Sequence, residues 1–353
     1  MKLPSFLDEE RDPYLLGLLR IAIAALLLLL TLKLFRSYLG EGYFGDVFHM
    51  PLLPASLVPS RTGYVLLLGC QALGAVLALL GLAARPALLG AAMCGLYGMA
   101  CDRLQYHNNR YTLLLVALLV AFTPCDRTFL PFGRRRPAQR APAPRWAAYL
   151  IGGQLSLVYL ASSLGKVLDD DWRSGTVMSL RFARYREAAE PWLPGSMAAW
   201  LAEPWFGQTA AIAALTTELL LALGPWLKQS RIPALWLGVV FHVGIELFAR
   251  VELFSYTMLS AYLVFATPEL RERRLSWSTQ RGAARVLLPL FSRLDLLARF
   301  RHEQVAGQST LLVVHDRAGQ AHQGLAGLRE LARATPWLFP LWLPLRVLTW
   351  RTS

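Results

Sequence analysis

A lysine ends a segment of small and apolar residues and is followed at once by acidic and aromatic ones, in YLASSLGKVLDDDWRSG, residues 159–175. Small residues let membrane helices pack closely, and close packing would bury a lysine at the end of the segment. Loss of water favours the neutral amine of Lys166, whereas the neighbouring aspartates favour its ammonium form. Lys166 is therefore a candidate base at the mouth of a membrane cavity, and a surface anchor is the alternative interpretation.

Three further ionisable residues lie within apolar segments, where a charge is costly and marks a functional candidate. Glu218 occupies the middle of LTTELLLALGPW, and His242 and Glu246 are four residues apart in FHVGIELF, on one face of a helix. We expect Glu218 and His242 to meet across two helices, either as a structural clasp or as part of a site. Two other cations, Arg20 and Lys33, are expected to extend to the membrane surface.

A polar turn, CDRLQYHNNRY, separates two apolar segments at residues 101–111. Its hydrogen-bonding groups suit the mouth of a ligand site, but asparagine is also favoured in ordinary capped turns. Both interpretations remain open for His107, Asn108, Asn109 and Tyr111. No set of ligands with convincing metal-site spacing accompanies them, so no metal is predicted.

The composition indicates a membrane protein. The 353 residues are 55% hydrophobic and 17% charged, compared with about 25% charged residues in soluble domains. The net charge of +13 comes largely from arginines in a Pro/Arg-rich linker, residues 131–145, and in the segment after Pro268. Arginine beside membrane spans reports topology and contact with anionic lipid, and no basic stripe with interleaved aromatic residues predicts nucleic-acid binding.

The apolar segments predict an all-α polytopic membrane protein of about eight transmembrane helices. The predicted spans are residues 14–35, 64–82, 86–101, 111–124, 146–164, 208–227, 232–249 and 253–267. The distribution of lysine and arginine places both termini in the cytoplasm and the protein in the inner membrane. Residues 166–207 carry several tryptophans among apolar residues and are expected to form interfacial amphipathic helices on the outer face.

After residue 270 the sequence predicts a small basic α+β appendage in the cytoplasm, residues 271–353. We expect a basic amphipathic helix at residues 292–303, a hairpin at 309–324 that turns at 317–319, and a short helix at 325–336. The apolar stretch 337–350 is too broken by proline to span a membrane and could dock on its surface.

Several of these stretches together resemble one family. YHNNRYTLLLVALLVAFTPCDRTF, VYLASSLGKVLDDDWRSG, LTTELLLALGPW and FHVGIELFARVELFSYTMLSAYLVFATPE are similar in order and spacing to the horizontally transferred transmembrane (HTTM) domain family. That family includes vitamin K-dependent gamma-glutamyl carboxylase and many bacterial homologues. The resemblance assigns residues 1–270 to an HTTM-type domain.

The resemblance implies chemistry on a membrane hydroquinone such as vitamin K or menaquinol. In the carboxylase, a lysine deprotonates the hydroquinone, reaction with dioxygen yields a strong base, and carbon dioxide adds to the substrate carbanion. The resemblance assigns the role of that lysine to Lys166, the only lysine of its segment, and a supporting catalytic role to His107. The residues expected to bind or shape the site are Asn108, Asn109, Tyr111, Trp172, Glu218, His242 and Glu246.

The sequence departs from the carboxylase in three ways. Arg110 stands where the family often has a histidine, and one additional residue separates Lys166 from Trp172. The large extracytoplasmic domain is expected to be absent, and residues 271–353 resemble the end of a thioredoxin-like domain without its paired cysteines. Two alternatives to the enzyme therefore remain open: a membrane partner that helps to mature or export another protein, and a scaffold that binds quinone or lipid. Whether a protein or peptide is the substrate also remains open.

Overall fold

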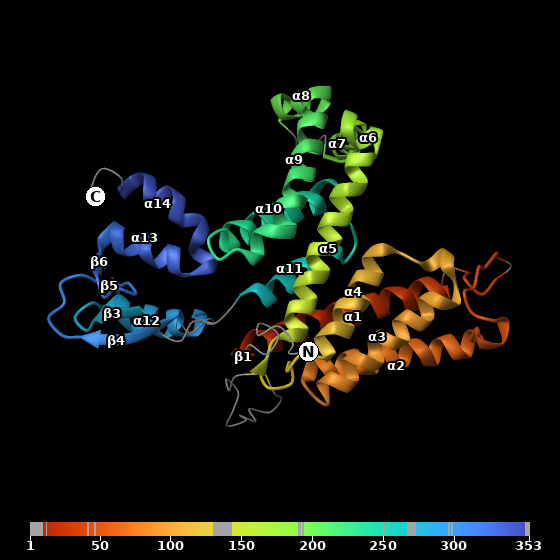
Figure 1. Cartoon of the computed structure of the whole chain (residues 1–353), viewed down its shortest axis with the longest axis horizontal. Coiled ribbons are helices and arrows are strands. Elements are labelled where there is room, and N and C mark those ends of the chain that lie inside the picture. Colours follow the sequence, from red (N-terminus) through yellow and green to blue (C-terminus); the bar gives the residue numbers. More distant parts are fainter. Residues whose placement is uncertain are drawn as a thin grey trace, which may run out of the picture. The chain divides into compact units, whose positions relative to one another are not determined.

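The computed structural model describes residues 10–11, 13–40, 42–45, 47–129, 143–189, 192, 194–249, 251–266, 273–295, 297 and 299–349. The chain divides into a helical unit, Met1–Phe265, and a smaller unit that contains a sheet, Ala266–Ser353 (Figure 1). The predicted Pro/Arg-rich linker, residues 131–145, lies outside the described residues except for its last three.

The first unit consists almost entirely of helices, and a short antiparallel pair of strands, β1 (Glu10–Arg11) and β2 (Ala143–Pro144), joins two of its segments. The α-helices are α1 (Tyr14–Gly40), α2 (Arg61–Leu80), α3 (Ala84–Cys101), α4 (Asn108–Ala121), α5 (Trp146–Leu168), α6 (Asp170–Ser174), α7 (Thr176–Ala189), α8 (Gly195–Ala202), α9 (Pro204–Leu223), α10 (Arg231–Phe248) and α11 (Phe254–Ala261). The 3-10 helices are η1 (Ala55–Leu57), η2 (Arg103–Gln105), η4 (Gly224–Trp226) and η5 (Tyr262–Phe265).

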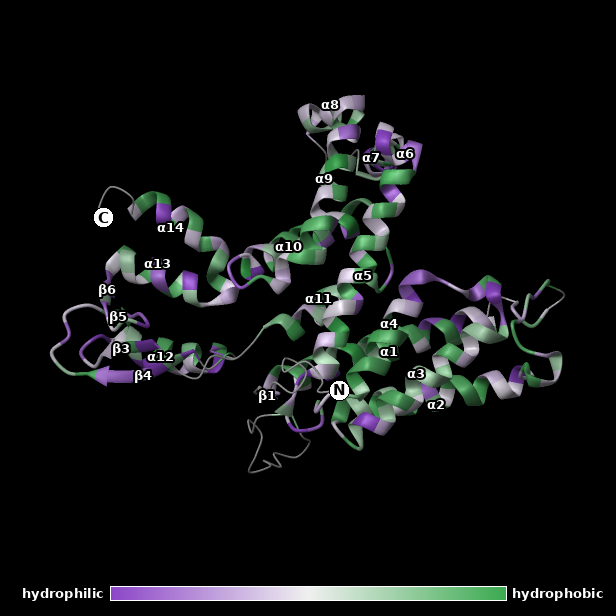
Figure 2. Ribbon diagram, viewed as in Figure 1, coloured by the Kyte–Doolittle hydropathy of each residue, from purple (hydrophilic) through white to green (hydrophobic). Residues whose placement is uncertain are grey.

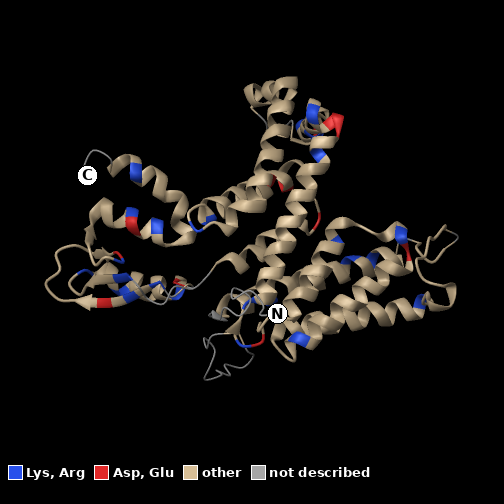
Figure 3. Ribbon diagram, viewed as in Figure 1, with Lys and Arg blue, Asp and Glu red and all other residues tan. Residues whose placement is uncertain are grey.

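Each of the eight predicted spans contains a helix, but eight complete spans are not confirmed. Among the described residues, five helices are long and apolar enough to cross a membrane: α1, α2, α5, α9 with η4, and α10. The predicted fourth and eighth spans correspond to shorter apolar helices, α4 and the continuous α11–η5 segment. Apolar residues cover long stretches of the helical unit in Figure 2, and Figure 3 shows few charged residues there. The chain is therefore a membrane protein.

Helix α1 lies at the centre of the first core cluster, where Leu19, Ile23 and Leu27 are fully buried. Arg20 is also fully buried, so the expectation that it extends to the membrane surface is wrong. Its guanidinium donates hydrogen bonds to the backbone carbonyls of Cys125, Thr128 and Phe129, at 2.9–3.1 Å. Because three carbonyls replace its lost water, this arginine can stay inside the bundle and fix the segment that follows α4.

Helices α5 and α9 pack side by side, as Figure 1 shows, and serine side chains join their backbones. Ser156 donates to the carbonyl of Ala222 at 2.7 Å, and Ser163 donates to that of Leu215 at 3.3 Å. The short helices α6, α7 and α8 connect the two at one end, within the segment predicted to form interfacial helices. This connection places the end of α5, which carries Lys166, beside α9.

The second unit contains a four-stranded sheet with the strand order β4-β3-β5-β6. The strands are β3 (Arg273–Ser278), β4 (Phe300–Val305), β5 (Leu312–His315) and β6 (Ala321–Gln323), and the helices are α12 (Gly282–Leu294), α13 (Gly324–Ala334), η6 (Pro336–Leu341) and α14 (Trp342–Thr349). Strand β3 pairs in parallel with β4 and antiparallel with β5, which pairs antiparallel with β6.

The predicted hairpin and the helix after it are confirmed as β5–β6 and α13. The predicted helix at residues 292–303 is wrong, because α12 ends at Leu294 and β4 begins at Phe300. The carboxylate of Asp295 accepts hydrogen bonds from the backbone N–H groups of Arg299 and Phe300, at 2.9 and 3.0 Å. These bonds turn the chain out of the helix and into the strand.

Candidate functional site

The centre of the site is an ion pair between the last turn of α5 and the C-terminal half of α9. The Nζ atom of Lys166 lies 2.7 Å from both carboxylate oxygens of Glu218 and 2.5 Å from the hydroxyl of Ser162. Ser162 stands four residues before Lys166, on the same helix face, and donates to Glu218 at 3.0 Å. The side chains of Lys166 and Glu218 are only 14% and 7% exposed, so the pair is largely withdrawn from water.

Trp172 brings a second cation close to this pair. Its ring centroid lies 4.9 Å from Nζ of Lys166 and 5.2 Å from the guanidinium carbon of Arg181, which belongs to α7. Both distances are within the range of cation–π attraction. The indole on the short helix α6 thus links the ion pair to the amphipathic helix beside it.

A chamber of about 840 Å³ lies next to the pair, between α4, α5, α7, α9, α10 and the turn before α11. Its wall is mainly apolar and includes the aromatic rings of Phe182, Phe206, Phe241, Phe248 and Phe254. The predicted site residues that line it are Asn108, Asn109, Tyr111, Lys166, Trp172 and Glu218. A few polar groups in a large apolar cavity are typical of a small-molecule site.

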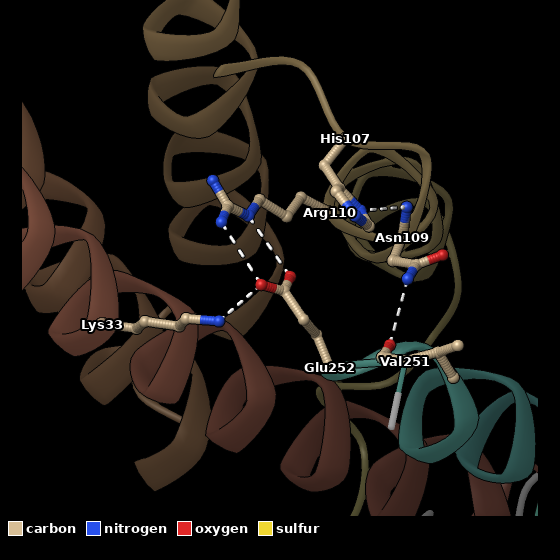
Figure 4. A network of polar contacts seen from close by, with 6 residues as sticks. All are labelled: Lys33, His107, Asn109, Arg110, Val251 and Glu252. Carbon is tan, nitrogen blue, oxygen red and sulfur yellow. Dashed lines mark hydrogen bonds and ion pairs between the residues drawn. The ribbon is translucent and has the colours of Figure 1, made fainter. Parts of the chain in front are cut away.

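A polar network fixes the wall of the chamber near the start of α4 (Figure 4). The side-chain amide of Asn109 donates to the backbone carbonyl of Val251 at 3.0 Å, and Arg110 contacts Glu252 at 3.3 and 3.4 Å. Lys33 of α1 donates to the same carboxylate. Burial would raise the pKa of Glu252, but its hydrogen bonds with Lys33 and Arg110 lower that pKa to about 2. The turn before α11 is thereby joined to α4 and α1.

His107 lies outside the chamber wall as far as the described residues show. It precedes α4, and its ring nitrogen accepts a hydrogen bond of 3.3 Å from the backbone N–H of Asn109. The members of the polar turn therefore differ in their surroundings. His107 caps the helix, whereas Asn108 and Asn109 face the chamber.

The expected contact between Glu218 and His242 does not form. Glu218 pairs with Lys166 instead, and the fully buried His242 contacts the hydroxyl of Tyr159 at 2.7 Å. That hydroxyl also contacts Tyr262 at 2.5 Å. A cationic partner compensates for the water that the buried carboxylate loses. Glu246 lies on α10 and does not line the chamber, and one of its carboxylate oxygens has no hydrogen-bond partner in the described part of the chain.

Sequence reasoning missed several residues that the structure brings to the site. The sequence pattern presents Ser162 and Ser163 only as small residues, although their spacing of four and three from Lys166 places them next to it on the helix. The sequence indicated only that Arg181 belongs to an amphipathic segment, and nothing in it marked this arginine as a site residue. Arg110 and Glu252 are 142 residues apart, and only tertiary structure could show that they meet.

Within the described residues, no group of three or more histidine, cysteine, aspartate or glutamate side chains could hold a metal ion. The family model of the HTTM domain matches residues 9–270. No solved structure matches the chain.

Proposed function

Because the chain belongs to the HTTM domain family, we propose that it is a membrane enzyme in which Lys166 acts as a base on a membrane hydroquinone. The family is related to vitamin K-dependent gamma-carboxylase, and the proposed chemistry is of the epoxidase or carboxylase type. We further propose that the protein lies in the inner membrane with both termini in the cytoplasm.

One observation carries this proposal: the amine of Lys166 lies at the wall of a large apolar chamber and contacts a carboxylate through both oxygens. A lysine that served only as a surface anchor would extend its amine into water. Here the side chain is 14% exposed, and its charge is compensated from within the protein. Buried, partnered ionisable groups beside a cavity are common at catalytic sites.

The pair also supplies a route to the neutral amine. A ligand that fills the chamber expels water from it. Without that water, the ammonium of Lys166 and the carboxylate of Glu218 are less favoured relative to a neutral amine and a neutral carboxylic acid. Transfer of one proton from Lys166 to Glu218 then gives an amine and a carboxylic acid without releasing a proton to solvent. The amine can accept the proton of a ligand hydroxyl that lies within hydrogen-bond distance. Ser162, which contacts both groups, holds them in place during the transfer.

The other chamber residues fit a hydroquinone with an apolar tail. The side chains of Asn108, Asn109 and Tyr111 offer hydrogen bonds at one part of the wall, and the phenylalanine rings offer apolar contact elsewhere. When bound, the hydroquinone supplies, together with dioxygen, the oxidative chemistry that generates a base strong enough to remove a carbon-bound proton. The molecule that loses this proton could be a protein, a peptide or a smaller acid.

The test is turnover of reduced menaquinone by the full chain in lipid nanodiscs, with the oxidised products identified by mass spectrometry. We expect Lys166→Ala to abolish epoxide formation. Lys228→Ala is the matched control, because Lys228 is an exposed lysine between η4 and α10 and lies outside the chamber wall. Equal turnover by Lys166→Ala and the wild type would overturn the proposed role of Lys166.

A scaffold that only binds quinone gives a different pattern. It would retain a stoichiometric quinone after purification, and neither the wild type nor any variant would form epoxide. Extraction of the purified protein and mass spectrometry of its lipids therefore accompany the turnover assay. Bound quinone without turnover would favour the scaffold over the enzyme.

A further inference from the structure

The charges at the chamber wall do not balance. Among the described residues that line it, Lys166, Arg181 and Glu218 are the charged ones at neutral pH. Glu218 compensates for Lys166 through contacts of 2.7 Å to both oxygens. The wall therefore carries one positive charge in excess, and that charge belongs to Arg181.

Arg181 has no carboxylate partner within the described part of the chain. Its contact there is with the ring of Trp172, at 5.2 Å. Two other arginines of this unit do have carboxylate partners: Arg110 contacts Glu252, and Arg173 contacts Asp170. Burial lowers the pKa of Arg181, but a guanidinium remains charged at any physiological pH. Arg20 donates to three backbone carbonyls, whereas Arg181 has no hydrogen-bond partner in the described part of the chain. Burial of such a cation is costly unless a ligand supplies the partner.

We infer that the chamber binds a long-chain carboxylate whose head group pairs with Arg181 and whose hydrocarbon chain lies against the apolar wall. The guanidinium of an arginine can donate two parallel hydrogen bonds to the two oxygens of a carboxylate. A lysine ammonium acts as a point charge and does not match this geometry. The Trp172 ring lies 5.2 Å from the guanidinium carbon, and no hydrogen bond within the described part of the chain occupies the N–H groups of Arg181. The acid would use the same apolar wall as the proposed hydroquinone, so it is a second class of ligand for this chamber, and the inference does not depend on the hydroquinone chemistry.

The apolar wall of the chamber favours a ligand whose remaining part, beyond the carboxylate, is a hydrocarbon chain. Phe182 follows Arg181 directly on α7, and Phe206, Phe241 and Phe248 belong to neighbouring helices. The helices α9 and α10 that form this wall are long and apolar enough to cross a membrane. A small polar acid would leave these surfaces uncovered, whereas a hydrocarbon chain would cover them and remove them from water.

The test is titration of the detergent-solubilised full chain with hexadecanoate, followed by native mass spectrometry to obtain stoichiometry and Kd. We expect one hexadecanoate per chain and, for Arg181→Gln, a loss of affinity of about tenfold or more, the usual effect of removing a charge-assisted hydrogen bond. Arg184→Gln is the matched control. It removes the same charge one turn further along α7, at an exposed position outside the chamber wall, and should leave the Kd unchanged.

Titrations with three further ligands show which parts of hexadecanoate the chamber recognises. Hexadecanol tests whether the charge is needed, acetate tests whether the chain is needed, and hexadecyl phosphate tests whether a phosphate is preferred. We expect all three to bind more weakly than hexadecanoate. Arg181→Lys retains the charge without the two parallel hydrogen bonds and should lose less affinity than Arg181→Gln, which keeps the test valid if the glutamine variant does not fold.

The inference is overturned if Arg181→Gln, Arg181→Lys and the wild type bind hexadecanoate equally, or if the phosphate binds more tightly than the carboxylate. It is also overturned if the wild type binds no acid. None of these results affects epoxide formation by the wild type and its loss in Lys166→Ala. Failure of this inference and failure of the proposed function are therefore separate outcomes.

Discussion

At the scale of single residues, the decisive feature is that Lys166 has a carboxylate partner. The pair is largely buried, and removal of one partner from a buried ion pair generally costs about 3–5 kcal/mol because the other charge is left uncompensated. The pair is thus a structural element, and in the proposed mechanism it also exchanges one proton between its two members. Substitutions at Lys166 must separate these two roles if they are to report on chemistry.

Glu252 provides a test of the network in Figure 4 through its pH dependence. Its pKa in the folded protein, about 2, is below its ordinary value of 4.5. A carboxyl group with a lowered pKa stabilises the fold fully above its ordinary pKa, and this contribution is lost as the pH falls towards the folded-state value. We therefore expect Glu252→Gln to be less stable than the wild type at pH 7.

The measurement is the unfolding free energy of both proteins from pH 7 down to pH 3, in detergent. The difference between them should be constant above about pH 5 and should shrink as the pH falls below 4.5. Glu187→Gln, at an exposed position on α7, is the control and should show little difference at any pH. A difference for Glu252→Gln that grows towards acidic pH would contradict the network.

The sequence indicated which residues belong to the site better than it indicated which of them contact each other. Glu218 stood out because charges are rare in apolar segments, and Lys166 stood out because it ends a segment of small residues and precedes acidic and aromatic ones. The sequence paired Glu218 with His242, and the structure pairs it with Lys166. Which of several polar groups meet depends on the rotation of each helix about its axis, and a single sequence does not determine that rotation for helices that are apolar all round.

At the scale of elements, the approach of α7 to α9 defines one side of the chamber. Gly175 has a φ of +83°, and a Cβ atom there would lie 2.4 Å from the backbone nitrogen of Gln208. Because neither the backbone conformation nor the space admits a side chain, α7 can reach its place only through a glycine. The residues carried by α7, including Arg181 and Phe182, depend on this contact.

We expect Gly175→Ala to destabilise the protein by about 1–3 kcal/mol, because it imposes backbone strain and separates α7 from α9. Gly153→Ala is the matched control, since a Cβ atom there meets nothing within 4 Å and the residue lies inside α5. Thermal unfolding of the two variants measures the effect. Equal unfolding temperatures for both variants would show that the close contact at Gly175 does not exist.

Helix positions were largely predictable, because long apolar segments have few alternatives to a helix in a membrane. Helix lengths were less so: α4 begins at Asn108 after its His107 cap, and α11 is only eight residues long before a 3-10 turn. Strand β4 was missed because no proline or glycine separates its sequence, FRHEQV, from the amphipathic helix before it. The Asp295 carboxylate accepts two backbone hydrogen bonds where that helix ends, and such bonds are hard to predict from sequence.

At the scale of the whole molecule, the chain joins a helical membrane unit to a small α/β unit, and each has its own hydrophobic core. The bias of lysine and arginine predicts that residues 166–207 lie outside the cytoplasm and that the turn between η4 and α10 lies inside. The chamber wall includes residues of α6 and α7, so this orientation would also place that end of the chamber on the outer side.

Cysteine labelling tests this orientation. Ser174 and Gln229 are exposed residues on the two opposite sides in the predicted topology. We expect a membrane-impermeant maleimide added to intact cells to label Ser174→Cys but not Gln229→Cys, with the wild type as the background for the four native cysteines. The reverse pattern would show that the topology is inverted.

The measurement that tests the central claim most directly is epoxide formation by Lys166→Arg. Arginine keeps the positive charge and can pair with Glu218, but it does not become a neutral base in a protein. If Lys166 acts as the base, this variant unfolds at a temperature close to that of the wild type and forms no epoxide. Epoxide formation at the wild-type rate by a stably folded Lys166→Arg protein would contradict the account, because an ion pair alone would then be sufficient.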